Sequence, residues 1–237
     1  MFEDFQWKKL ENEGHTLPYR FYEPPHLEPG KIYPLVLLMH GAGERGNDNR
    51  HQLMNFEGIA FWQKYPCFVL APQCPLHEPD RPDDHCVWVA TSFGGPAHTM
   101  KVEPTWPMKL TLELLEKSTS EYPVDFKRIY LTGLSMGAFA AWELLQRVRE
   151  KFAAAIPVCG GADLKNASEL VNFPLWVFHG DADQIVLAQR SRDMVAAIKA
   201  KGGHPKYTEY PGLGHDIYKT TYTNPEVWDW LFAQSKK

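Results

Sequence analysis

The expected fold is decided by the stretch Arg128-Ile129-Tyr130-Leu131-Thr132-Gly133-Leu134-Ser135-Met136-Gly137. Its apolar, partly β-branched and aromatic beginning is typical of a buried strand. The apolar residues that follow recur at steps of three and four, which indicates a helix over 138–148. Ser135 lies between the two, with a glycine two residues away on either side, as a tight strand-to-helix turn requires. The stretch therefore predicts a strand, a sharp turn and a helix, with the Ser135 hydroxyl at the carboxyl end of the strand.

Short strands and longer helices alternate on both sides of this stretch. Continuous apolar runs indicate strands at 33–39, 67–71, 153–158 and 174–178, and Tyr207-Thr208-Glu209-Tyr210 is predicted as a further strand. Helical spacing covers 108–122 and 187–198, and a closing helix follows Asn224-Pro225. The alternation predicts an α/β fold with a mostly parallel central sheet and helices on both faces. Aromatic runs around a Glu13-Gly14 turn predict an antiparallel N-terminal hairpin at the edge of the sheet.

Residues 72–107 show neither the helical nor the strand spacing of apolar residues. The segment is rich in proline and polar residues, and so long a loop inside a compact domain is usually functional. A chain of 237 residues with 44% apolar ones can bury a core of its own. We therefore expect one domain over 1–237, with 72–107 as a loop insertion near the active site. Nothing between residues 158 and 173 is long enough for a lid, so we expect an open site.

The charge balance and the termini bear on partners and location. Lys and Arg number 25 against 29 Asp and Glu, a net charge of −4, so nucleic acid is not an expected partner. No run approaches the roughly 20 apolar residues that cross a bilayer, and no signal-peptide pattern opens the chain. As written it is expected in the cytoplasm, or outside the cell if a leader was removed. The sequence leaves open the oligomeric state and whether Cys74 and Cys86 form a disulfide.

A serine hydroxyl needs a base in order to attack a carbonyl, and the base needs a carboxylate to orient it. Asp183 lies in the loop after the strand at 174–178, and His215 lies in the loop after the strand at 207–210. Both loops are expected at the sheet edge that carries Ser135. Because the order Ser, Asp, His is a known order of the catalytic triad, we predict Ser135 as nucleophile, His215 as base and Asp183 as acid.

Other polar residues near these positions fit supporting roles. Asp181 is the less favoured acid, since it fits a capping or loop-closing role. His40 and His179 lie at strand ends and fit packing or supporting roles better than that of a base. Glu44 and Arg45 fit either an ion pair that pins their loop or a solvated position.

Four motifs, in this order, resemble those of the α/β-hydrolase-fold serine esterases. They are Leu38-Met39-His40-Gly41-Ala42-Gly43-Glu44-Arg45-Gly46, the glycine-flanked turn at Ser135, the block His179-Gly180-x-x-Asp183-x-x-Val186, and Gly214-His215. From about Tyr19 onward the chain is similar to the phospholipase/carboxylesterase and dienelactone-hydrolase-like branch, which is related to feruloyl and acetyl-xylan esterases. The resemblance implies that the backbone amides of Ala42 and Met136 form the oxyanion hole. Ala138 stands where a third glycine is common in close relatives.

The expected function is hydrolysis of short-chain acyl or aryl carboxylic esters through an acyl-enzyme, on a small-molecule ester and without a cofactor. The alternatives are a serine peptidase of the same fold and a non-catalytic binding module, although a binding module would be expected to lose part of the triad. Trp88, Trp106 and Ile185 are candidate substrate-binding residues, with Phe93; the aromatic ones fit a small core of the loop equally well. The histidines, cysteines and acidic residues of 72–107 match no metal-ligand spacing, so no metal is expected.

Overall fold

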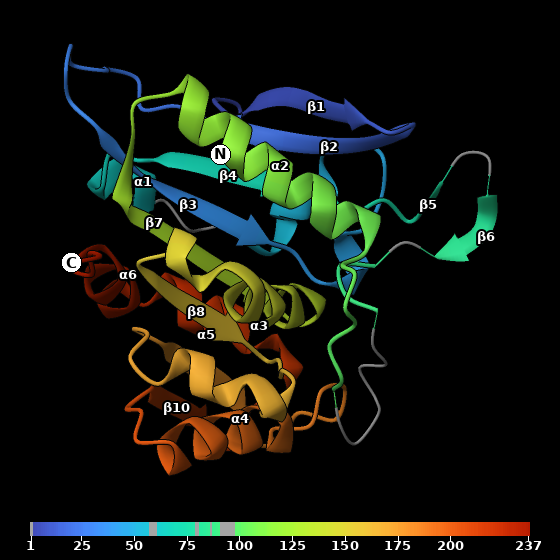
Figure 1. Cartoon of the computed structure of the whole chain (residues 1–237), viewed down its shortest axis with the longest axis vertical. Coiled ribbons are helices and arrows are strands. Elements are labelled where there is room, and N and C mark those ends of the chain that lie inside the picture. The colour runs from blue at the N-terminus through green and yellow to red at the C-terminus, as the bar shows by residue number, and fades with distance from the viewer. Residues whose placement is uncertain (1, 57–60, 79–80, 86, 91–97) are drawn as a thin grey trace.

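The computed structural model of the chain describes residues 2–56, 61–78, 81–85, 87–90 and 98–237 (Figure 1). Eight strands form one sheet in the order β1-β2-β4-β3-β7-β8-β9-β10. Their bounds are β1 Gln6–Asn12, β2 His15–Tyr22, β3 Tyr33–Met39, β4 Phe68–Pro72, β7 Val124–Leu134, β8 Ala154–Val158, β9 Trp176–Gly180 and β10 Lys206–Tyr210. The strands from β4 to β10 are parallel to one another, and the β1–β2 hairpin adds to β4 in the antiparallel sense.

Helices cover both faces of the sheet (Figure 1). The α-helices are α1 Phe61–Lys64, α2 Trp106–Glu121, α3 Met136–Val148, α4 Gln189–Ala200, α5 Tyr218–Thr223 and α6 Pro225–Phe232. Short 3-10 helices are η1 Ala42–Glu44, η2 His51–Phe56, η3 Arg149–Lys151, η4 Leu164–Leu170 and η5 His215–Ile217. Buried side chains of α2, α3 and α4 form one core with the sheet, and those of α1, α5 and α6 form a second core on the other face.

The strands divide their side chains between the two cores. In β3, Leu35, Leu37 and Met39 lie in the core under α2 and α3, while Val36 and Leu38 lie in the other. Successive side chains of a strand point to opposite faces, so a strand covered on both faces must be apolar throughout. This is why the parallel strands were recognisable as continuous apolar runs, and the observed α/β fold confirms that prediction.

The N-terminal hairpin is also confirmed. Glu13 and Gly14 connect β1 to β2 with φ angles of +51° and +81°, as a two-residue turn of the type I′ class requires. The hairpin pairs Asn12 with His15 and Gln6 with Phe21. It therefore extends the parallel sheet by two antiparallel strands.

The segment 72–107 is not only a loop, contrary to the sequence-based prediction. Two short strands, β5 (His77–Glu78) and β6 (Arg81–His85), pair antiparallel as a separate hairpin that stands out from the body (Figure 1), and α2 begins inside the segment at Trp106. Polar, proline-containing strands lack the apolar alternation that a one-sided or two-sided sheet imposes, so the pattern carried no signal. Phe93 and Cys86 lie outside the described residues, and the Cys74–Cys86 disulfide stays an open question.

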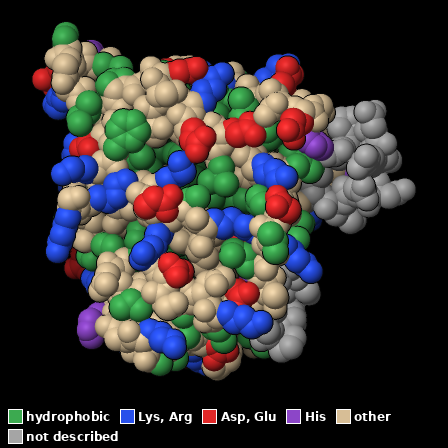
Figure 2. Space-filling model, viewed as in Figure 1, with side chains coloured by type: hydrophobic (Ala, Val, Ile, Leu, Met, Phe, Trp, Pro, Cys, Tyr) green, Lys and Arg blue, Asp and Glu red, His purple; other side chains and the backbone are tan. Residues whose placement is uncertain are grey.

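Three features of the whole molecule concern its partners and its connecting segments. Among the described residues no helix is long and apolar enough to cross a membrane. On the face shown in Figure 2, Lys and Arg side chains alternate with Asp and Glu side chains and gather in no large area of one sign. Between β8 and β9, residues 159–175 hold the short η4 helix and no lid domain.

Candidate active site

The predicted catalytic residues follow three parallel strands at the same edge of the sheet. β7 ends immediately before Ser135, β9 ends shortly before Asp183, and β10 ends shortly before His215. The strands are joined in register through the pairs Leu134/Val158, Val158/Phe178 and Gly180/Tyr210. Their carboxyl ends are therefore level, and the three loops emerge side by side.

Ser135 lies on a strained turn between β7 and α3. Its φ of 53° and ψ of −121° are rare for a residue other than glycine and cost about 1–3 kcal/mol. Hydrogen bonds from Ser135 N to Val158 O (2.9 Å) and from Ala138 N to Ser135 O (2.8 Å) hold the turn. The half-buried side chain stands at the N-terminus of α3, where the helix dipole favours negative charge.

The loop after β3 runs beside Ser135. A β-carbon placed on Gly41 would lie 3.5 Å from Ser135 Cβ, and η1 begins at the next residue, Ala42. Arg45 Nε donates to Ala42 O (3.0 Å). Of the two residues predicted to supply oxyanion-hole amides, Ala42 thus follows a residue in contact range of Ser135, and Met136 follows Ser135 itself.

His40 supports this loop from within the core. It is fully buried; its Nε2 accepts a hydrogen bond from Cys74 N (2.8 Å), and its Nδ1 donates to Gly41 O (2.7 Å). Burial lowers the pKa of His40 to about 4, so the ring is neutral near pH 7 and both nitrogens are occupied. Trp88 Nε1 donates to His40 O (3.1 Å). His40 therefore has a supporting role and is not available as a base.

Glu44 lies behind the same loop. Its Oε1 accepts a hydrogen bond from Asn55 Nδ2 (2.6 Å), while its buried Oε2 makes no hydrogen bond of normal geometry to a described residue. That oxygen would be 2.8 Å from a β-carbon on Gly41. Burial raises the pKa of Glu44, against its hydrogen bonds and its attraction to a protonated His215. The sequence left open an ion pair that pins the loop or a solvated position for Glu44; the structure buries this carboxyl and gives it Asn55 of η2 as a partner, which no local pattern could indicate.

Asp183 and His215 are joined directly. His215 Nδ1 lies 2.7 Å from Asp183 Oδ2, while Asp183 Oδ1 accepts hydrogen bonds from Ile185 N (2.8 Å) and Val186 N (2.9 Å). Burial alone would raise the pKa of Asp183, but hydrogen bonds from His179, His215 and the two amides outweigh it and hold that pKa below its usual range. Asp183 is thus an anion near pH 7, directed at one imidazole nitrogen of His215.

The competing acid, Asp181, has a different role. It is exposed, and its Oδ1 accepts a hydrogen bond from Gly212 N (2.7 Å). That bond closes the loop after β9 against the loop after β10. The arrangement matches the loop-closing role that the sequence suggested for Asp181.

Ser135 and His215 lie at the same edge of the sheet without a direct hydrogen bond between their side chains. Ser135 N bonds to Val158 O, and the next residue, Cys159, approaches His215 O with its Sγ (3.6 Å). Among the described residues no hydrogen bond joins Ser135 Oγ to the His215 ring. Such bonds are often long in an enzyme without substrate and tighten when the substrate binds.

A cluster of possible metal ligands lies beneath this site. Ligand atoms of Cys159, His179 and Asp183 lie within 4.8 Å of one another, and all three residues are buried. Burial and the charge of Asp183 raise the pKa of the Cys159 thiol, and both nitrogens of His179 already face other groups. These three side chains bond to their neighbours and therefore do not fit a metal ion.

The predicted substrate-binding residues are placed differently from one another. Trp88 is fully buried in the core that the sheet forms with α2, α3 and α4, so it presents no ring face. Trp106 is half-buried at the start of α2 and stacks on His15 at 4.5 Å. Ile185 is 66% exposed, two residues after Asp183. Of the three, Ile185 lies at the rim of the site.

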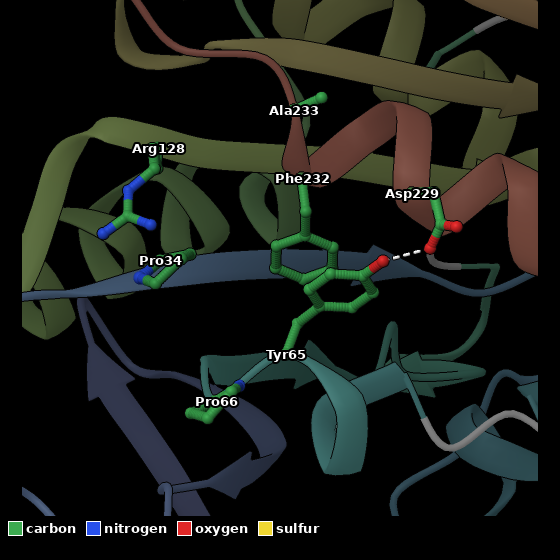
Figure 3. A pocket seen from close by; sticks show the side chains of 7 residues that line it. All are labelled: Pro34, Tyr65, Pro66, Arg128, Asp229, Phe232 and Ala233. Carbon is green, nitrogen blue, oxygen red and sulfur yellow. Dashed lines mark hydrogen bonds between the residues drawn. The ribbon is translucent and has the colours of Figure 1, made fainter.

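The pocket drawn in Figure 3 lies elsewhere. It has a volume of about 350 Å³ and is lined by Pro34, Tyr65, Pro66, Arg128, Asp229, Phe232 and Ala233. The Tyr65 and Phe232 rings stack on each other, and the Tyr65 hydroxyl bonds to Asp229 (Figure 3). Pro34 and Arg128 belong to the early part of their strands, so this pocket is at the end of the sheet away from Ser135.

The sheet order and the strained serine turn at its carboxyl edge define the chain as an α/β hydrolase. Residues 97–225, more than half of the chain, match the dienelactone hydrolase family, and the chain belongs to that family.

Known proteins are similar to much or all of the chain. A crystal structure of a thermostable esterase is 36% identical, and the match covers 99% of this chain and 64% of that chain, with a TM-score of 0.88. A bifunctional acetylxylan esterase/xylanase of Neocallimastix patriciarum is 25% identical over 78% of this chain, which spans 24% of that protein. A ferulic acid esterase shares the fold, with a TM-score of 0.69 at 16% identity over 95% of this chain and 98% of its own. The chain therefore spans only part of the first two.

Proposed function

We propose that the protein is a serine esterase that hydrolyses short-chain acyl or aryl carboxylic esters. The observation that carries the proposal is the 2.7 Å bond between His215 Nδ1 and Asp183 Oδ2, at the same sheet edge as Ser135 in a member of the dienelactone hydrolase family. This bond leaves His215 Nε2 as the nitrogen that can take a proton from a nucleophile.

In the proposed reaction the Ser135 hydroxyl attacks the ester carbonyl while His215 Nε2 accepts its proton. The amides of Ala42 and Met136 stabilise the oxyanion of the tetrahedral intermediate, and the N-terminus of α3 adds favourable dipole potential. His215 then protonates the departing alcohol, leaving an acyl group on Ser135. A water molecule, deprotonated by His215, cleaves that acyl-enzyme by the same route.

The substrate class follows from the shape of the site and from the relatives. Ser135 is accessible, Ile185 is exposed at the rim, and residues 159–175 carry no lid. Without a cover, the site offers little surface on which to bury a long acyl chain. Relatives that are named as acetylxylan and ferulic acid esterases make acetyl and hydroxycinnamoyl esters of sugars the substrates to try first.

The test compares p-nitrophenyl esters from acetate to palmitate, with the wild-type protein, Ser135→Ala and the exposed control Ser120→Ala. We expect cleavage of short esters, weak cleavage of long ones, and a loss of several orders of magnitude in kcat for Ser135→Ala only. A fluorophosphonate should label Ser135, as read by peptide mass spectrometry. A wild-type protein that cleaves peptide amides but no esters would contradict the proposal. So would a Ser135→Ala variant that is as active on esters as the wild-type protein.

A further inference from the structure

His179 is a fully buried histidine that the proposed reaction does not use. It stands near the end of β9, four residues before Asp183. Its Nε2 lies 2.8 Å from Val186 O and 3.2 Å from Asp183 Oδ2, and its Nδ1 lies 2.7 Å from Ser191 Oγ. The ring thus touches both ends of the loop that carries the proposed catalytic acid.

The hydrogen-bond partners of His179 determine which of its ring nitrogens carries a hydrogen. Val186 O and Asp183 Oδ2, an anion, can only accept hydrogen bonds, so Nε2 carries a hydrogen and shares it between them. Ser191 Oγ is also 2.9 Å from Gly160 O, and its single hydrogen goes either to that carbonyl or to Nδ1. When that hydrogen goes to Nδ1, the ring carries its one hydrogen on Nε2. When it goes to Gly160 O, Nδ1 donates to Ser191 Oγ, and the two acceptors at Nε2 then require a hydrogen on both ring nitrogens.

The consequence concerns the orientation of the carboxylate. Two amides hold Asp183 Oδ1, while Oδ2 lies 3.2 Å from His179 Nε2 and 2.7 Å from His215 Nδ1. We propose that His179 is a positioning residue for the hydrolysis: its Nε2 hydrogen fixes Asp183 and the Val186 carbonyl so that Oδ2 is directed at His215. This inference rests on the proposed function, because it assigns His179 a role through the same Asp183–His215 pair.

Other titratable groups surround this arrangement. Cys159 approaches from the end of β8, Glu209 pairs with His179 in the register of β10, and Arg192 of α4 neutralises Glu209 through bonds of 2.8 Å. On the side of His215, Glu44 and Asp216 are further acidic groups. Glu44 and Glu209 are acidic and Arg192 bonds to Glu209, so these three leave Asp183 alone. The Cys159 thiol hydrogen-bonds to Asp183, and His179 and His215 are the imidazole partners of that carboxylate.

The chain allows a matched pair of variants. In His179→Gln the amide nitrogen falls near the position of Nε2 and can reach Asp183, whereas in His179→Asn it falls near Nδ1 and cannot. We expect His179→Asn to lower kcat by about 10–100-fold with KM within about two-fold, and His179→Gln to stay within about three-fold of wild type. Removing the function of a triad acid lowers kcat by about 10⁴-fold, and this sets the upper limit for the effect of His179→Asn.

The pH profile separates positioning from a general loss of packing. Without the His179 donor, His215 is the remaining imidazole partner of Oδ2, and the carboxylate stabilises the imidazolium form of His215 more strongly. The acid limb of kcat/KM should therefore move to higher pH in His179→Asn. Ser191→Ala is the matched control, because it is equally buried and touches the ring only at Nδ1; its acid limb should not move. Equal kcat and pH profiles for the Asn and Gln variants would overturn the inference.

A measurement on the unaltered protein covers the case in which a variant does not fold. Nitrogen-15 histidine NMR reports which ring nitrogen carries the hydrogen, and we expect His179 to be protonated at Nε2 throughout the active pH range. A His179 ring protonated only at Nδ1 would overturn the inference. If Ser135→Ala were fully active, the proposed function would fail first, and the two failures are therefore distinguishable.

Discussion

Asp183 is a carboxylate that the fold keeps ionised in the interior. It is 2% exposed, and burying a charge without partners would favour its neutral form. Here four N–H groups face its two oxygens, and together they hold its pKa below the usual range. Glu44, in the loop after β3, has the opposite balance, because burial exceeds its hydrogen bonds and raises its pKa.

Because burial raises the pKa of Glu44, unlike that of Asp183, we predict that Glu44→Gln stabilises the fold near neutral pH. A carboxyl whose pKa is higher in the folded state than in the unfolded state costs stability once pH rises above the unfolded value, about 4. Gln keeps an oxygen for Asn55 and carries no charge. We therefore expect the variant to raise Tm by about 1–3 °C at pH 7, with the gain disappearing near pH 4.

Calorimetry at pH 4 and pH 7 checks this expectation. Glu150→Gln, an exposed substitution, serves as the control and should leave Tm nearly unchanged at both values. A Glu44→Gln variant that is less stable at pH 7 than at pH 4, relative to wild type, would show that the ionised carboxylate stabilises the fold.

At the scale of elements, the serine turn depends on the contact between α3 and β3. A β-carbon on Gly137 would lie 2.0 Å from Met39 O, and one on Gly133 would lie 2.2 Å from Gly137 O. Both clashes are with backbone atoms, which have no rotamer to change. The glycines flanking Ser135 therefore set how closely the helix and the strand approach, and with that the position of the proposed nucleophile.

We predict that Gly137→Ala lowers the free energy of unfolding by roughly 3 kcal/mol, at the upper end of overpacking costs, and removes most ester hydrolysis. Urea denaturation and p-nitrophenyl acetate turnover measure the two effects. Gly43→Ala is the matched control for stability, because nothing lies within 4 Å of its added carbon. A Gly137→Ala protein within about 1 kcal/mol of wild type would mean that α3 can move away from β3 at little cost.

At the scale of the whole molecule, carboxylates with lowered pKa values should govern acid stability. Besides Asp183 these include Glu209, whose pKa the Arg192 hydrogen bonds lower to about 2, and Asp125, Asp48 and Asp229. A group whose pKa is lower in the folded state stabilises the fold above its unfolded value and loses that contribution as pH falls. The free energy of unfolding should therefore decrease from about pH 5 to pH 2.

The decrease can be assigned in part to Asp183. Urea denaturation measures the free energy of unfolding across that pH range. In Asp183→Asn this free energy should fall by roughly 2 kcal/mol less than in wild type, the size expected for one strongly shifted carboxylate. Asp181→Asn, at an exposed position, should keep the wild-type slope. Identical slopes for Asp183→Asn and wild type would place the acid sensitivity in other groups.

Much of this architecture could be predicted from the sequence. The parallel strands were recognisable because a strand buried on both faces must be apolar throughout, as in Leu35 to Met39. The hairpin was recognisable because Glu13-Gly14 interrupts two aromatic runs. In contrast, β5 and β6 carried no period, and Trp88 could be placed in the core only once its neighbours were known.

The sequence by itself determined the α/β fold, the strained turn at Ser135 and the loops that deliver Asp183 and His215 to one edge. These follow from local requirements, namely which side chains a strand or helix can bury and where only glycine fits. Only the tertiary structure decided which groups those residues meet: the four donors around Asp183, Asn55 at Glu44, and His179 beneath the pair. Hydrogen bonds and burial at these positions come from segments far apart in the chain, so no local pattern encodes them.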